Sequence, residues 1–322
     1  MASTEILSAG PEGLARAAEI LAQGDLVAFP TETVYGLGGD ARQDKAVARI
    51  FAAKGRPRFN PLIVHVPDLE TAGRYGVITA AARDLAARFW PGPLTMVLPL
   101  RTDAGLSPLV TAGNDSVAIR VPAHPLARAL LTKFAGPIAA PSANPSGRVS
   151  PTRAQHVIDG LAGRIEAVID GGPCAVGVES TILSLDPPML LRPGGVAAEA
   201  IEAALGLPLP TGGNAQKPSA PGQLASHYAP AAPVRLGADR PHADEVYVTF
   251  GTRPAPGQLT LSSTGDLTEA AANLFHILRE ADRLAGPEGR IAFAPVPERD
   301  LGRAINDRLR RAAAPRPAQP EA

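Results

Sequence analysis

Short apolar segments alternate with polar, proline- and glycine-rich turns along most of the chain. Runs of four or five apolar residues predict buried strands, as at 26–29 and 62–66. Apolar residues spaced three or four apart predict amphipathic helices, as at 12–23 and 45–54. The same patterns predict strands at 94–98, 116–121, 137–140, 167–170, 181–185 and 189–191, and helices at 79–89, 125–134 and 197–205. Strands and helices that alternate in this way are typical of an α/β fold.

Two polar stretches carry further local signals. Residues 31–39 are polar and rich in glycine, so they are expected to form a turn after the strand at 26–29. Ser150 is expected to cap a helix that begins at Pro151, because proline suits the first helical position.

The pattern changes at about residue 207, which predicts a division into domains. Residues 207–233 hold many prolines and glycines and almost no apolar periodicity, as linkers do. Beyond them, strands are predicted at 245–250, 259–261 and 291–294. A long helix, capped by Asp266 or Thr268, is predicted to reach about 284, and a second helix is predicted over 300–312. The sequence therefore predicts a first domain over 1–206, a linker over 207–233, a small Rossmann-like α/β domain over 234–313, and a disordered tail over 314–322.

Composition excludes several classes of protein. The 31 basic and 31 acidic residues balance, whereas a nonspecific nucleic-acid coat needs a basic excess. The single cysteine, Cys174, cannot form an intramolecular disulfide or a thiolate metal cluster. No segment reaches the ~18 apolar residues of a membrane span, and Met1–Gly10 lacks a cationic start and an apolar run. We expect a soluble, cytoplasmic protein without a membrane partner.

A turn with three cations is the first sign of chemistry. Lys54, Arg56 and Arg58 lie between a predicted helix and a predicted strand, in a turn that one glycine and two prolines stiffen. Arg and Lys bind phosphate oxygens directly, so fixed cations at a sheet edge favour a polyphosphate site. A solvated surface loop is the alternative.

Five polar turns follow predicted strands in the first domain, at the place where α/β sheets bind ligands. These turns hold Thr31–Thr33, Arg120, Ser142–Asn144, Ser180–Thr181 and Arg192. Four basic side chains can together neutralise a triphosphate: Lys54, Arg56, Arg120 and Arg192. Thr33 and His65 are uncharged and can hold a small polar substrate.

Each of these residues also has a structural explanation. Arg120 can simply pair with a surface carboxylate, and Ser142 and Asn144 can satisfy turn backbone. His65, in an apolar strand, can be a core histidine. The six histidines show no metal-ligand spacing, and neither a P-loop nor a GxGxxG fingerprint is present. The residues alone thus predict an α/β protein with a cationic anion site other than a P-loop.

Motifs in a fixed order resemble a known family. Phe29–Leu37, Lys54–Pro57, Asn60–Leu62 and Pro91–Thr95 resemble the YrdC-like family. So do Arg120–Pro122, Pro141–Asn144 with Ser146–Gly147, and Glu179–Thr181. The linker and last domain, with His227–Pro230, are similar to the long two-domain form of the family, threonylcarbamoyl-AMP synthase.

The resemblance implies a fold and a function. It implies a twisted, mainly parallel open sheet with a large concave site. It also implies a nucleotidyltransferase that forms L-threonylcarbamoyladenylate and pyrophosphate from L-threonine, bicarbonate or CO2, and ATP, for the threonylcarbamoyladenosine modification of tRNA. Mg²⁺ is expected to accompany ATP, with no metal ligands supplied by a dedicated protein site. A tRNA threonylcarbamoyl transferase machinery is expected to take the product, without a stable complex between this chain and nucleic acid.

The resemblance also implies roles for individual residues. A catalytic tetrad is matched by Lys54, Arg56, Ser142 and Asn144. ATP is expected to contact Arg56, Asn60, Ser116, Ser142, Ser150 and Arg192. Threonine is expected to lie among Thr33, His65, Arg120, Ala140 and Ser180, with its carboxylate on Arg120.

The linker is expected to fold over the site as a lid, with His227 or Tyr228 touching the nucleotide. Excluding water would protect a product that hydrolyses readily. This linker departs from the family, because Gln223 stands where members carry Met and Ser226 stands where they carry a basic residue.

Three other functions remain as alternatives. An RNA-binding module is disfavoured by the neutral net charge and the 4% aromatic content. A carbamoyltransferase of the hydrogenase-maturation type would need zinc-finger cysteines that this chain lacks. A nucleotide sensor without turnover is the third.

Overall fold

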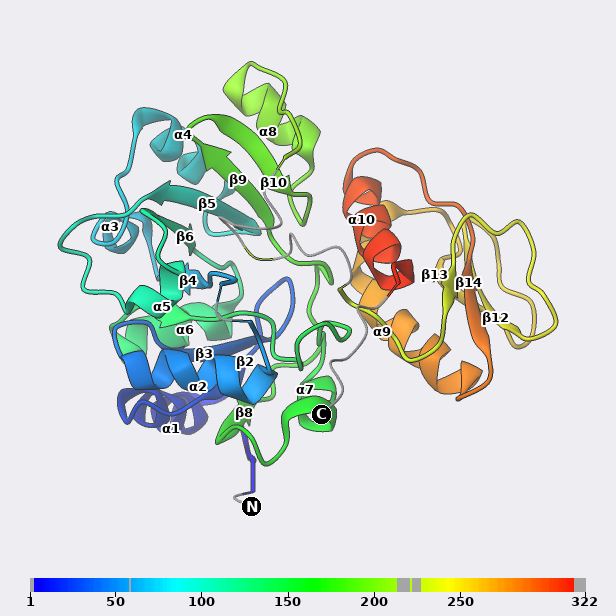
Figure 1. Ribbon diagram of the computed structural model, residues 1–322, viewed down its shortest axis with the longest axis horizontal. Coiled ribbons are helices and arrows are strands. Elements are labelled where there is room, and N and C mark those ends of the chain that lie inside the picture. The colour runs from blue at the N-terminus through cyan, green and yellow to red at the C-terminus, as the bar shows by residue number, and fades with distance from the viewer. Residues whose placement is uncertain (1–2, 58, 213–220, 222–226, 316–322) are drawn as a thin grey trace. The chain divides into compact units, whose positions relative to one another are not determined.

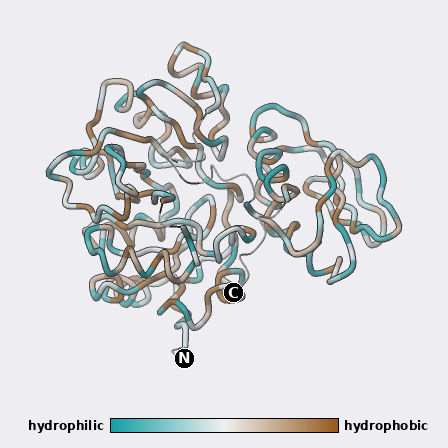
Figure 2. Tube along the Cα trace, in the orientation of Figure 1, coloured by the Kyte–Doolittle hydropathy of each residue, from teal (hydrophilic) through white to brown (hydrophobic). Residues whose placement is uncertain are grey.

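The computed structural model describes residues 3–57, 59–212, 221 and 227–315 (Figure 1). Contacts divide the chain into two compact units. Unit 1 comprises Met1–Ser146 and Ser150–Gln223, and unit 2 comprises Gly147–Val149 and Leu224–Ala322. Hydrophobic segments, brown in Figure 2, alternate with hydrophilic ones along both units. Among the described residues, no helix combines the length and hydropathy that crossing a lipid bilayer requires.

Unit 1 is built on one large sheet. Its strands, in spatial order, are β1 (Glu5–Leu7), β8 (Ala167–Ile169), β2 (Val27–Phe29), β3 (Gly36–Asp40), β7 (Ile138–Ala139), β4 (Ile63–His65), β6 (Ser116–Arg120), β5 (Leu94–Pro99), β9 (Thr181–Leu185) and β10 (Pro188–Arg192). Strands β3, β4, β6 and β10 run opposite to the other strands of this described sheet. The expected α/β fold with a large open sheet is confirmed, and most of its strands share one direction.

Strand β3 is a correction to the turn expected over 31–39. Gly36–Asp40 pairs with β2 on one side and β7 on the other. A Cβ added to Gly38 would lie 2.8 Å from the Phe29 ring and 2.9 Å from a methyl group of Ile138. Glycine therefore serves close packing within the sheet here, and only the residues before Gly36 form the turn.

The helix expected to begin at Pro151 starts later. Helix α7 spans Ala154–Leu161, with Arg153 at its N-cap. The Ser150 hydroxyl donates a hydrogen bond to Glu179 Oε1 at 2.5 Å. Ser150 is thus engaged by a carboxylate from a distant segment, and the expectation that it caps this helix was wrong.

Helices cover one face of the large sheet along its length. The helices of unit 1 are α1 (Pro11–Ala22), α2 (Asp44–Lys54), α3 (Leu69–Ala72), α4 (Ala80–Phe89), α5 (Pro108–Thr111), α6 (Pro125–Phe134), α7 and α8 (Ala198–Leu205). All except α1 and α6 contribute to the main core, which packs against one face of the sheet from β8 to β10. On the other face, α1 and α6 cover the half formed by β1, β8, β2 and β7.

The remaining half of that second face differs. Its hydrophobic cluster consists of strand residues only: Ile63, Val97, Ala118, Ile182 and Leu191, with Met189 packed against them. These residues belong to β4, β5, β6, β9 and β10, and we call this half the open half of the sheet. A face that presents apolar side chains, with no described helix in its hydrophobic cluster, is suited to a ligand.

Unit 2 has a small sheet of its own. Its strands, in spatial order, are β11 (Val234–Arg235), β14 (Arg290–Phe293), β12 (Glu245–Phe250) and β13 (Leu259–Ser262), and every described pairing is parallel. Helices α9 (Leu267–Ala285) and α10 (Leu301–Ala313) complete the unit. The expected small α/β domain is confirmed. Asp266 caps α9 by accepting a hydrogen bond from Glu269 N at 2.7 Å.

The segment expected as a linker is only partly described. Leu209 packs in the main core of unit 1, and Leu190 N of β10 donates to Pro210 O at 2.9 Å. The start of this segment thus belongs to unit 1 structurally. Residues 213–220 and 222–226 of the expected lid and tail residues 316–322 lie outside the described residues.

Candidate active site

Two strand ends bring a histidine and an arginine together on the open half. His65 at the end of β4 is the register partner of Arg120 at the end of β6. Each lies two residues beyond a member of the open-half cluster, Ile63 and Ala118, so both side chains point to the open half. Two of the five residues expected to surround threonine are therefore neighbours.

His65 and Arg120 begin a row of residues, each opposite the next in the sheet register, that continues across three more strands. The register that pairs Met96 with Ile119 places Thr95 of β5 opposite Arg120. Thr95 is paired with Ile182 of β9, and Ile182 is paired with Arg192 at the end of β10. The row thus links residues from five strands that are far apart in the sequence.

Arg120 is held in a buried ion pair. Its Nη2 donates to Glu32 Oε1 at 2.6 Å, its Nη1 donates to Thr33 Oγ1 at 2.8 Å, and its Nε donates to Gly92 O at 3.3 Å. The Arg120 and Glu32 side chains are 4% and 11% exposed. The carboxylate partner considered for Arg120 exists, but it is buried beside the site and does not lie on the surface.

Glu32 carries a charge in this buried position. Its Oε2 accepts hydrogen bonds from Ala123 N at 3.0 Å and His124 N at 3.3 Å. Burial acts to raise the pKa of Glu32, but the charge and hydrogen bond of Arg120 and the main-chain N–H donors outweigh it, so the pKa lies below its usual value. The carboxylate is therefore ionised at neutral pH.

His65 is neutral. Burial, and next to it the charge of Arg120, lowers its pKa to about 3. The ring makes an edge contact with Phe29 at 6.2 Å between centroids, as a core histidine would. Its Nδ1 is buried without a hydrogen-bond partner in the described part of the chain. A buried polar atom of this kind is stabilised when a ligand supplies a partner.

Ser180 connects Thr95, in the middle of the row, to Arg192 at its end. Its hydroxyl lies 2.7 Å from Thr95 Oγ1. Its carbonyl accepts from Arg192 Nε at 3.2 Å and Nη2 at 2.8 Å. A residue expected near threonine thus contacts a residue expected near ATP.

Lys54 connects α2 to the loop that carries Ser142 and Asn144. Its Nζ donates to Ser142 O at 2.6 Å and also to Asn144 O. Burial, and next to it the charge of Arg56, holds the pKa of Lys54 well below its usual value, while the charge of Glu179 acts in the opposite direction. Lys54, Ser142 and Asn144, three members of the expected tetrad, are thus in direct contact.

The loop after Lys54 is braced from within. Arg56 Nε and Nη2 donate to Asn60 O at 3.3 Å and Pro61 O at 2.9 Å. Both Arg56 and Asn60 are buried, and Asn60 Oδ1 has no hydrogen-bond partner among the described residues. The alternative of a solvated loop does not hold for Arg56, while Arg58 lies outside the described residues.

Ala140 and Ser150, two further residues expected in the site, lie close to the residues described above. Ala140 N donates to Ile63 O at 2.9 Å, which places Ala140 beside the strand of His65. Ser150 is bound to Glu179, the residue before Ser180 in the sequence. Unit 1 therefore brings the expected threonine residues together and joins them, through Ser180, to Arg192.

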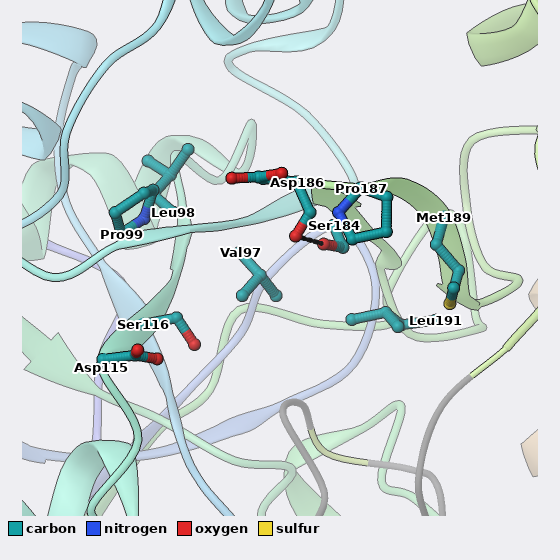
Figure 3. A pocket seen from close by; sticks show the side chains of 10 residues that line it. All are labelled: Val97, Leu98, Pro99, Asp115, Ser116, Ser184, Asp186, Pro187, Met189 and Leu191. Carbon is teal, nitrogen blue, oxygen red and sulfur yellow. Dashed lines mark hydrogen bonds between the residues drawn. The ribbon is translucent and has the colours of Figure 1, made fainter.

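A cavity of about 630 Å³ extends the open half beyond the row (Figure 3). Ser116, expected to contact ATP, lies two residues before Ala118 on β6 and lines this cavity. The other residues that line it are Val97, Leu98, Pro99, Asp115, Ser184, Asp186, Pro187, Met189 and Leu191.

His227 and Tyr228 are placed by contacts within unit 2. The Tyr228 ring lies 5.4 Å from the Phe275 ring and 5.5 Å from the guanidinium carbon of Arg308. His227 N donates to Arg311 O at 3.3 Å. The two residues are buried in packing with α9 and α10, and their expected contact with nucleotide stays a prediction.

The sequence matches two family models. The Sua5/YciO/YrdC model, described as telomere recombination, matches residues 19–194. A second model, the C-terminal domain of threonylcarbamoyl-AMP synthase, matches residues 196–314. The chain belongs to the Sua5/YciO/YrdC family.

Similarity to other members of the Sua5/YciO/YrdC family extends over nearly the whole chain. The threonylcarbamoyl-AMP synthase of Bacillus subtilis (strain 168) is 44% identical, over 96% of this chain and 95% of that protein. The threonylcarbamoyl-AMP synthase of Pyrococcus abyssi (strain GE5 / Orsay) is 43% identical, over 92% and 93%. The crystal structure of P. abyssi Sua5 complexed with L-threonine superposes with a TM-score of 0.88 at 40% identity, covering 96% of this chain and 98% of that one. The expected family and its two-domain form are confirmed.

Three residues of the site were not foreseen. Glu32, Thr95 and Glu179 each lie inside a motif that carries the resemblance to the Sua5/YciO/YrdC family. Glu32 and Glu179 directly precede the expected site residues Thr33 and Ser180, and that position was the available signal. Thr95 offered only its place in a motif, where a buried hydroxyl needs a hydrogen-bond partner. The side-chain partners of these three residues come from segments 29 to 88 residues away, which the sequence does not reveal.

Proposed function

We propose that this chain forms L-threonylcarbamoyladenylate and pyrophosphate from L-threonine, bicarbonate or CO2, and ATP. The observation that carries the proposal is the row from His65 through Arg120 and Thr95 to Arg192, which lies on the open half of the sheet. The near full-length similarity to enzymes named threonylcarbamoyl-AMP synthase supports the reaction. The P. abyssi structure with L-threonine supports the amino-acid substrate.

Arg120 is the proposed partner of the threonine carboxylate. Its guanidinium has five N–H donors, and described residues use one on each of its three nitrogens, so among these contacts one on Nη1 and one on Nη2 remain. Two parallel donors match a carboxylate. His65, through its buried Nδ1, is a proposed acceptor for the ammonium or hydroxyl of threonine. The rest of this subsite is formed by Thr33, Ala140 and Ser180.

The cationic groups beside this subsite are the proposed triphosphate site. Lys54 has a third N–H beyond the two that bind Ser142 and Asn144. The other proposed ATP contacts are Arg56, Asn60, Ser116, Ser142, Asn144, Ser150 and Arg192. Ser116 would meet the nucleoside end, in the cavity that it lines.

The reaction needs alignment more than activation. The threonine amine attacks CO2 and loses a proton, which gives a carbamate anion. A carbamate oxygen then attacks the α-phosphorus, and the bond from that phosphorus to the pyrophosphate oxygen breaks. The nucleophile is already charged, so the site must position two anions and stabilise charge as it develops on the phosphates.

Mg²⁺ is proposed to arrive with ATP. Among the described residues, no group of three or more His, Cys, Asp or Glu side chains could form a metal site. Bound Mg²⁺ commonly keeps several waters and is held by phosphate oxygens together with one or two carboxylates. Glu179 is a buried carboxylate, and it lies close enough to Lys54 to affect the pKa of Lys54. Bound Mg²⁺ would neutralise phosphate charge, while Lys54 and Arg56 orient the phosphates.

The product is proposed to pass to a tRNA threonylcarbamoyl transferase machinery, because an acyl adenylate hydrolyses readily in water. The direct test of activity is exchange of labelled pyrophosphate into ATP. We expect exchange that requires both threonine and bicarbonate. Tight tRNA binding without exchange would favour the RNA-binding alternative. A nucleotide sensor would bind ATP and give no exchange, and Lys54→Ala would then lower only its affinity.

A further inference from the structure

Glu32 places a fixed negative charge next to the residue that binds the threonine carboxylate. Its Oε1 lies 2.6 Å from Arg120 Nη2, and the side chain is largely shielded from water. Two main-chain N–H groups, of Ala123 and His124, hold the other carboxylate oxygen. The carboxylate is thus fixed on three sides and cannot swing away when a substrate approaches Arg120.

This arrangement sets the net charge of the subsite. Arg120 and Glu32 together carry no net charge, while His65, beside Arg120, is neutral. A purely anionic ligand on Arg120 feels the attraction of the guanidinium and also the repulsion of Glu32 beside it. A zwitterion is different, because its ammonium group is attracted by Glu32 while its carboxylate is attracted by Arg120.

We propose that Glu32 makes this subsite selective for a zwitterionic amino acid over an anion of the same shape. The proposal rests on the proposed function, in which threonine binds at Arg120. Selectivity of this kind has a purpose in this enzyme, because ATP and pyrophosphate are anions present at the same face of the sheet. Arg120 without Glu32 would attract their phosphates and compete with the neighbouring cationic groups.

The test compares two ligands of nearly identical shape. L-threonine is measured against 2,3-dihydroxybutyrate of the same configuration, in which a hydroxyl replaces the ammonium. Binding of each to the full chain is measured by calorimetry, with competition against threonine in the exchange assay as a second readout. We expect the wild-type protein to bind threonine at least about tenfold more tightly than the hydroxy acid.

Glu32→Gln is the decisive variant, because it keeps the size and one of the two accepting oxygens but removes the charge. The ratio of the two affinities should fall to within about twofold of unity. Glu166→Gln is the matched control, since it removes a carboxylate from the Arg49 ion pair elsewhere in unit 1, and its ratio should stay that of the wild-type protein. A merely structural role of Glu32 would weaken both ligands equally and leave the ratio unchanged, which would overturn the proposal.

Two measurements remain decisive if Glu32→Gln does not fold. Glu32→Asp keeps the charge on a shorter side chain, so its preference for threonine should persist even if both ligands bind more weakly. The wild-type protein alone also decides, because equal affinity for the two ligands would contradict the proposal. Failure to bind threonine at all would instead contradict the proposed function.

Discussion

Lys54 Nζ donates to the main-chain oxygen of Ser142 at 2.6 Å, so the end of α2 fixes the loop that carries two expected catalytic residues. Lys54→Met keeps the apolar stem but removes the ammonium group. We expect the rate of adenylate formation to fall by about a hundredfold or more, because both the loop position and the proposed phosphate contact are lost. Initial rates of pyrophosphate release measure the effect. Lys45→Met, an exposed change on the same helix, should leave the rate unaltered, and a fully active Lys54→Met enzyme would contradict this role.

Arg192 holds the Ser180 carbonyl through both Nε and Nη2. A lysine cannot reproduce two donors in one plane. Arg192→Lys should therefore raise the KM for ATP about tenfold, with a smaller change in the KM for threonine. Steady-state rates at varied ATP and saturating threonine give the KM for ATP. Rates at varied threonine and saturating ATP give the KM for threonine. Arg49→Lys, whose partners are Asp25 and Glu166, is the control; an unchanged KM for ATP in Arg192→Lys would exclude Arg192 from the ATP site.

Tyr35 fastens the turn before β3 to the loop at Gly171 and Gly172. Its hydroxyl donates to Gly172 O at 2.7 Å and accepts from Gly171 N at 3.2 Å. Tyr35→Phe removes this partner from two part-buried main-chain groups and should lower the free energy of unfolding by about 0.5–1.5 kcal/mol. Urea denaturation measures this, with Tyr75→Phe, at a half-buried tyrosine, as the comparison. Equal stability of Tyr35→Phe and the wild-type protein would show that water replaces the hydroxyl.

His65 should make the stability of unit 1 depend on pH. Its pKa is about 3 in the folded protein and near 6.5 when unfolded, so the unfolded chain takes up the proton first as the pH falls. The contribution of neutral His65 to the free energy of unfolding is fully present above about pH 6.5. It is lost as the pH falls from about 6.5 to 3, by up to about 1.4 kcal/mol per pH unit. Urea denaturation of the wild-type protein and of His65→Asn across this range measures the difference. The variant should have the flatter profile; parallel profiles would mean that His65 titrates normally.

The elements that the sequence predicted best are those with strong periodicity. The helix over 125–134 and the strand over 245–250 have the expected bounds, because apolar spacing and proline position agree there. Strand β3 was missed because Gly36, Gly38 and Gly39 suggest a turn, and only the facing Phe29 and Ile138 explain why glycine is needed. Local pattern could not supply that information.

The candidate site was predictable in its residues but not in their pairings. Arg120, Thr33 and His65 were grouped through the family motifs, and they are neighbours. The ion pair from Arg120 to Glu32 joins positions 88 residues apart, so no local signal announces it. Whether Glu32 or a surface carboxylate is the partner depends on the fold of the turn after β2, which brings Glu32 under the end of β6.

The central claim is that one face of this sheet joins threonine, bicarbonate and ATP. Incubation with ATP, threonine and labelled bicarbonate, followed by separation of the nucleotides, tests it most directly. We predict label in an adenylate that forms with pyrophosphate and disappears when threonine is omitted or Arg120 is replaced by Gln. Release of pyrophosphate without label in any adenylate, or labelling that does not depend on threonine, would contradict the claim.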